Sequence, residues 1–90
     1  MKTRLICTIH GRVQGVGFRW SIRELAVQLG MTGYVRNGED GGVDVVAEGR
    51  NEARETLRAF CYRGPDDATI TGVEVTEEPA TGEFSAFEIR

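Results

Sequence analysis

Hydrophobic and polar residues alternate along several stretches of the chain, which is the pattern of half-buried strands. In residues 5–10, Leu5, Cys7 and Ile9 alternate with Ile6, Thr8 and His10. Similar stretches follow at residues 32–37 (TGYVRN), 43–48 (VDVVAE) and 68–78 (ATITGVEVTEE), and a short last one at 84–90 (FSAFEIR). Gly72 interrupts the alternation in the fourth stretch, where we expect a β-bulge.

Two other stretches carry apolar residues at helical spacing. The apolar positions of the first are Phe18, Ile22, Leu25, Ala26 and Leu29, and those of the second are Ala53, Leu57, Phe60 and Cys61. Gly30 ends the first helix, and Gly64 with Pro65 ends the second. Asn51 is a candidate N-cap for the second helix.

The order of these elements is β-α-β-β-α-β with one strand appended, which favours an α+β sandwich of the ferredoxin-like type. We expect an antiparallel sheet of four to five strands, with both amphipathic helices on one face. The segment NGEDGG, residues 37–42, joins the two middle strands and contains Asn-Gly and Asp-Gly, both strong hairpin signals. The 90 residues predict a single domain, 1–90.

Charge divides the chain into two parts. The net charge is −3, but six of the 11 basic residues and only one of the 14 acidic residues fall in residues 1–38, so that segment carries +5. A local excess of positive charge in an acidic protein indicates an anion site and argues against a broad nucleic-acid surface.

Composition also limits compartment and cofactor. We expect a cytoplasmic protein, because no apolar run approaches a membrane span and residues 1–9 show no signal-peptide pattern. Cys7 and Cys61 are expected to be buried free thiols. With His10 as the one histidine and no Cys-x-x-Cys, we expect no metal and no other cofactor.

The stretch IHGRVQGVGFRW, residues 9–20, lies between a strand and a helix and contains three glycines. It lacks the Lys-Ser/Thr of a Walker loop and the last glycine of a dinucleotide fingerprint. Glycines there can still turn backbone N–H groups toward one anion, which would also explain a cation, Arg19, in the first helical turn. The alternative is that the glycines only turn the chain and Arg19 extends into water.

Other candidate residues have two interpretations each. Asn37 either occupies a hairpin turn, which the sequence favours, or orients a water through its amide. Trp20 lies nearly opposite Phe18 on the helical wheel; it either shapes a pocket rim or packs partly against a loop, and we favour the second. We expect His10 and Arg36 at the surface.

The segments GRVQGVGFR (11–19) and GYVRN (33–37) together resemble the paired signature of the acylphosphatases, and the similarity extends over nearly the whole chain. The resemblance implies metal-free hydrolysis of acyl phosphates to a carboxylate and inorganic phosphate, by a monomer. It implies that Arg19 and the backbone of Gln14, Gly15, Val16, Gly17 and Phe18 bind phosphate, and that Asn37 holds the attacking water. Inorganic phosphate or sulfate should then compete with substrate. Gly38 is a departure, because family members often carry a bulkier residue there.

Two other function classes share some of these features. A regulatory anion-binding module would keep Arg19 and the glycine loop without needing Asn37. An RNA-binding domain shares the element order but needs aromatic residues on its sheet, and VDVVAE has none.

Overall fold

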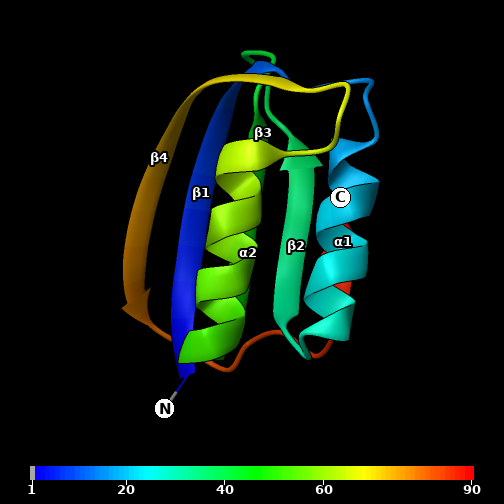
Figure 1. Ribbon diagram of the computed structural model, residues 1–90. Coiled ribbons are helices and arrows are strands. Elements are labelled where there is room, and N and C mark those ends of the chain that lie inside the picture. Colours follow the sequence, from blue (N-terminus) through cyan, green and yellow to red (C-terminus); the bar gives the residue numbers. More distant parts are fainter. Residues whose placement is uncertain (1) are drawn as a thin grey trace.

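The computed structural model describes residues 2–90 and contains one five-stranded sheet with two helices on one face (Figure 1). The elements are β1 (Lys2–Arg12), α1 (Phe18–Gln28), β2 (Thr32–Asn37), β3 (Val43–Arg50), α2 (Asn51–Arg63), β4 (Thr69–Pro79) and β5 (Phe87–Ile89). The strand order is β4-β1-β3-β2-β5. The ferredoxin-like α+β fold is therefore confirmed. Within residues 2–90, neither helix has the length and hydropathy needed to cross a bilayer.

The core lies between the helices and the sheet. Leu5, Cys7 and Ile9 of β1 are fully buried, as their alternation predicted, and they pack with apolar residues from both helices. Burial of these side chains is the main favourable contribution to folding. Both cysteines are buried and unpaired, which confirms the expectation for Cys7 and Cys61.

The last strand corrects the expectation of a wholly antiparallel sheet. β5 pairs with β2 in parallel, with Val35 opposite Ile89, whereas the pairs of β1 with β3 and β4 and of β2 with β3 are antiparallel. The strand is also shorter than the expected 84–90. Phe84 lies outside it, and the centre of its ring is 6.0 Å from the centre of the Tyr34 ring. The parallel pairing carries the chain end toward the same edge of the sheet as the end of β2.

Two local expectations have different outcomes. The register between β1 and β4 shifts after the His10–Gly72 pair, so Thr71 of β4 has no partner residue in β1. This bulge lies beside Gly72, as predicted. The N-cap of α2 is Arg50 rather than Asn51, and it makes no side-chain capping bond. Arg50 still pairs with Lys2 in the sheet, so the strand passes directly into the helix and leaves no residue free to cap it.

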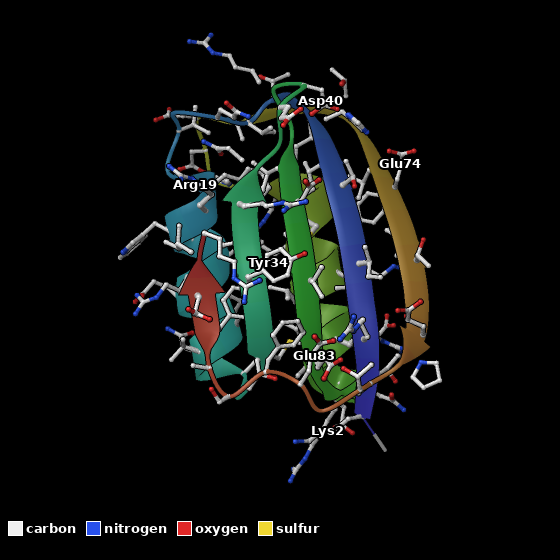
Figure 2. The ribbon with its side chains drawn as sticks, turned by 180° about the vertical axis from the view of Figure 1, so that it is seen from behind. Lys2, Arg19, Tyr34, Asp40, Glu74 and Glu83 are labelled. Carbon is white, nitrogen blue, oxygen red and sulfur yellow. The ribbon has the colours of Figure 1, made fainter. Side chains whose placement is uncertain are left out.

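Glu48 is a buried carboxylate on the sheet face away from the helices. It is 3% exposed and accepts hydrogen bonds from the backbone N–H groups of Thr81 (2.9 Å) and Gly82 (3.0 Å) and from Arg4 Nε (2.8 Å). Arg4 also pairs with Glu83, which Figure 2 places at the end of the sheet near Lys2. These bonds hold the segment between β4 and β5 against the sheet.

The charge state of Glu48 follows from these contacts. Burial raises the pKa of Glu48, but the hydrogen bonds from Thr81, Arg4 and Gly82 lower it by more, and the net pKa is about 2, below the ordinary value of 4.5. A carboxyl whose pKa falls on folding stabilises the folded state above its unfolded pKa. That contribution is lost as the pH falls from about 4.5 toward 2.

We expect Glu48→Gln to lower the free energy of unfolding at pH 7 by about 2 kcal/mol, because charge-assisted hydrogen bonds to buried backbone donors are lost. The variant should also lose less stability than the wild type between pH 5 and pH 2. Urea denaturation at several pH values measures both effects. Glu83→Gln is the matched control, because Glu83 contacts the same arginine from an exposed position, and it should lower the stability much less than Glu48→Gln does. Equal losses for the two variants would contradict this role of Glu48.

Candidate active site

A small hollow lies where the segment between β1 and α1 meets the ends of β2 and β5. Its volume is about 150 Å³, and its lining residues are Val13, Gly15, Gly17, Phe18, Arg19, Trp20, Asn37 and Ile89. Figure 2 shows Arg19 at the same end of the molecule as Asp40 of the β2–β3 connection, far from Glu83. Three parts of the chain that are distant in sequence thus share one cavity.

The two glycines of the hollow have a backbone that other residues rarely adopt. Gly15 has φ 75° and Gly17 has φ 79°, both in the left-handed region. A Cβ added at either position would meet nothing within 4 Å, so the requirement for glycine comes from backbone strain and not from crowding. The loop therefore turns sharply and leaves its backbone open to the cavity.

The first turn of α1 has an unbalanced positive end. Gly17 is its N-cap and supplies no side-chain hydrogen bond, and the first turn contains no acidic residue. The free N–H groups of such a turn carry partial positive charge. Arg19 is partly buried, lines the same cavity, and has no ion pair with any carboxylate of residues 2–90. An anion in the hollow would meet all of these donors.

Asn37 also lines the hollow, and its position overturns the favoured hairpin interpretation. It is the last residue of β2 and pairs with Val43, so the turn consists of residues 38–42 and does not include it. No residue other than glycine has a positive φ among residues 2–90, whereas a two-residue Asn-Gly turn would need one at Asn37. Its side chain is therefore free to face the cavity.

Gln14 connects the glycine loop to this hairpin. Its Nε2 donates hydrogen bonds to the carbonyl oxygens of Gly38 and Gly42, both at 2.9 Å. The Gly38 N–H donates to the Gly42 carbonyl at 2.8 Å, which closes the hairpin. Backbone and Gln14 contacts thus hold the hairpin next to Asn37 without a side chain at position 38.

The remaining candidate residues differ in their position relative to the hollow. The side chain of Val16 packs against the core, which leaves only its backbone for an anion, and His10 pairs with Glu74 of β4 at 2.8 Å, away from the cavity. Trp20 lies at the cavity rim, and it also lines a second hollow together with residues 64–66 of the α2–β4 loop. Val13 and Ile89 also line the site, and sequence analysis singled out neither. Only the parallel pairing of β5 with β2 brings Ile89 there, and no local pattern signals that pairing.

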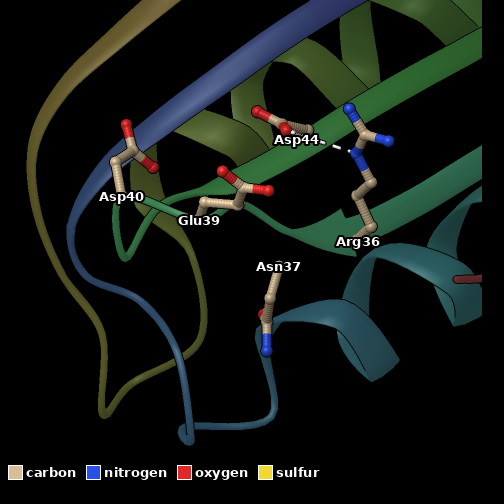
Figure 3. Close-up of a pocket in the computed structure, with 6 residues that line it drawn as sticks. Arg36, Asn37, Glu39, Asp40 and Asp44 are labelled. Atoms are coloured by element: carbon tan, nitrogen blue, oxygen red, sulfur yellow. Dashed lines mark hydrogen bonds and ion pairs between the residues drawn. The ribbon is translucent and has the colours of Figure 1, made fainter.

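A larger hollow of about 460 Å³ lies on the other side of Asn37 and has the opposite charge (Figure 3). Glu39, Asp40 and Asp44 line it, and its one cation, Arg36, is 3.4 Å from Asp44. In Figure 3 the Asn37 side chain points away from these carboxylates, toward the segment that enters α1. Three carboxylates repel an anionic ligand, so the smaller hollow is the better candidate for an anion site.

The geometry agrees with what the comparisons with known proteins find. The acylphosphatase family model matches residues 5–89, which include every residue of the hollow. The chain belongs to the acylphosphatase family. It is 48% identical over 86 residues to the acylphosphatase of Methylococcus capsulatus, covering 96% of this chain and 94% of that one. It is 51% identical over 82 residues to the acylphosphatase of Rubrobacter xylanophilus, covering 91% and 74%.

Solved acylphosphatase structures have the same fold. The crystal structure of acylphosphatase from Bacillus subtilis superposes with a TM-score of 0.92 at 31% identity, covering 98% of both chains. The acylphosphatase structure from Coxiella burnetii superposes with a TM-score of 0.91 at 35% identity, covering 99% of this chain and 93% of that one. The resemblance found in the two sequence signatures is thereby confirmed.

The sheet face away from the helices bears on the RNA-binding alternative. This acylphosphatase carries the aromatic ring of Tyr34 of β2 there (Figure 2), although VDVVAE has no aromatic residue. The Arg90 guanidinium lies 4.4 Å from the centre of that ring, and Phe84 packs edge-on to it. Tyr34 is thus occupied by intramolecular contacts, whereas RNA-binding sheets present aromatic rings to bases.

We expect Gln14→Met to lower kcat/KM for an acyl phosphate by about tenfold or more, because both bonds to the hairpin are lost and small displacements at a reacting centre are costly. Steady-state hydrolysis, with a thermal melt, measures the effect. Gln28→Met is the matched control, because Gln28 is exposed at the end of α1. If Gln14→Met melts lower and yet keeps wild-type kcat/KM, the contact stabilises the fold without positioning the site.

Proposed function

We propose that this acylphosphatase binds the phosphoryl group of its substrate with Arg19 and the backbone of Gln14, Gly15, Val16, Gly17 and Phe18. The support is that one cavity is lined by Gly15, Gly17, Phe18, Arg19 and Asn37 together. The loop backbone and the first turn of α1 offer N–H donors, and the guanidinium offers a planar fork that fits two phosphate oxygens. These groups stabilise the charge on the non-bridging oxygens during displacement at phosphorus.

Asn37 holds the attacking water in this proposal. Its amide both donates and accepts hydrogen bonds, so it can orient a water lone pair toward phosphorus. It lines the same cavity as Arg19 but belongs to a different strand, so the water and the phosphoryl group are held by separate walls. Holding both reactants in a fixed orientation removes part of the entropic barrier.

The leaving group explains why no acid–base pair is needed. The bond that forms joins the water oxygen to phosphorus, and the bond that breaks joins phosphorus to the carboxyl oxygen. The electron pair leaves with the carboxylate, which is a weak base and needs little protonation. The water proton passes to a phosphate oxygen, so the products are a carboxylate and inorganic phosphate.

Further features of the proposal concern the protein as a whole. Inorganic phosphate and sulfate should compete with substrate, because they fit the same donors. We propose that the protein acts as a monomer, which agrees with a cavity lined by residues of one chain. We also propose a cytoplasmic location, which agrees with two buried free thiols.

We expect Arg19→Lys to lower kcat/KM by about 10²-fold, because lysine keeps the charge but loses the bidentate fork. Hydrolysis of acetyl phosphate, with circular dichroism as the control for folding, measures the loss. Arg23→Lys is the matched substitution, because Arg23 is on the same helix and pairs with Glu24 outside the cavity. Wild-type turnover by Arg19→Lys would remove Arg19 from the phosphate site.

Asn37→Ala separates an enzyme from a regulatory anion-binding module. We expect it to reduce turnover by about 10²-fold while the affinity for inorganic phosphate stays within about twofold, because the side chain holds the water and not the phosphate. Isothermal titration with phosphate beside hydrolysis rates measures the two quantities. Equal losses in both would assign Asn37 to phosphate binding.

A further inference from the structure

Exposed apolar side chains are concentrated at the mouth of the anion site. Only four large hydrophobic residues are strongly exposed in residues 2–90, namely Trp20 (61%), Val27 (55%), Tyr62 (52%) and Ile89 (40%). Two of these four, Trp20 and Ile89, line the hollow that contains Arg19 and Asn37. They come from different elements, the first turn of α1 and the end of β5.

The cavity is small, with a volume of about 150 Å³. A phosphoryl group beside Arg19 and the attacking water beside Asn37 would occupy much of it, so a bulky acyl group would extend toward the rim. Apolar groups at the rim are where such a hydrocarbon would lie.

Trp20 also connects this rim to a second hollow. A space of about 480 Å³ between the two helices is lined by Trp20, Leu25, Phe60 and Pro65, among others. The indole therefore lies between a small cationic site and a larger groove, whose lining also includes the charged residues Glu24, Arg63 and Asp66. Its exposed ring gives a flat apolar surface at the junction.

We propose that Trp20 and Ile89 form the subsite for the acyl group and give this acylphosphatase a preference for aromatic and bulky aliphatic acyl phosphates over acetyl phosphate. The inference rests on the proposed function, because it assumes that the phosphoryl group occupies the cavity beside Arg19. The phosphoryl group provides binding energy common to all substrates, and the rim discriminates among their acyl parts.

The test compares benzoyl phosphate with acetyl phosphate in Trp20→Ala and Ile89→Ala. Each variant should lower kcat/KM for benzoyl phosphate about fivefold more than for acetyl phosphate, because each loses an apolar contact with the aromatic ring of the benzoyl group. Trp20→Phe should restore most of the preference. Tyr62→Ala and Val27→Ala are the matched controls, because these residues are as exposed and line neither hollow. The controls should leave the ratio of the two substrates unchanged.

Two further measurements separate the acyl subsite from the phosphate site. The inhibition constant for inorganic phosphate, which has no acyl group, should stay within about twofold in Trp20→Ala. Trp20 is the one tryptophan of the chain, so its fluorescence reports on the rim. Phenacylphosphonate, a carbon analogue of benzoyl phosphate that cannot be hydrolysed in the same way, should change the emission more than its methyl counterpart, acetonylphosphonate.

The outcomes are distinguishable. An equal loss for both substrates in Trp20→Ala and Ile89→Ala, or equal emission changes with both phosphonates, would overturn the acyl subsite and leave the proposed function intact. Wild-type rates in both Arg19→Lys and Asn37→Ala would instead overturn the proposed function, whatever the substrate preference of the rim variants.

Discussion

The two hydrogen bonds that Gln14 donates to Gly38 and Gly42 hold the two halves of the candidate site together. One half is the glycine loop with the start of α1, and the other is the end of β2 with its hairpin. Neither half forms the cavity alone, because Arg19 comes from one half and Asn37 from the other. A side-chain amide with two donor hydrogens suits this position, since it satisfies two carbonyl oxygens of one hairpin at once.

Charge is distributed so that the proposed anion site is separated from the protein's own carboxylates. The acidic side chains of the hairpin lie on the far side of Asn37, and Arg36 is paired there with Asp44. The buried carboxylate of Glu48 is enclosed by Arg4 and by the backbone of residues 81–82, at the other end of the sheet. Arg19 is thus left without a competing internal anion among residues 2–90.

The sequence predicted the features that depend on local pattern. Alternation placed β1 and its buried face correctly, and helical spacing placed α1 and α2, because both periodicities follow from backbone geometry. The prediction from sequence was wrong where the position of a residue depends on its neighbours in space. The Asn-Gly pair suggested a turn at Asn37, but pairing with Val43 keeps Asn37 in the strand. Ile89 could not be predicted, because its place depends on a parallel pairing between residues more than fifty positions apart.

The bond from the Gly38 N–H to the Gly42 carbonyl has a consequence for the chemical lifetime of the protein. In an Asn-Gly pair the glycine nitrogen can attack the preceding side-chain amide, form a cyclic imide and release ammonia, which leaves Asp or isoAsp. At 2.8 Å from its acceptor this nitrogen is engaged, and Asn37 is held extended as part of β2. The closed hairpin therefore protects Asn37, the side chain that we propose holds the water, against spontaneous deamidation. Each opening of the hairpin exposes Asn37 to that irreversible loss.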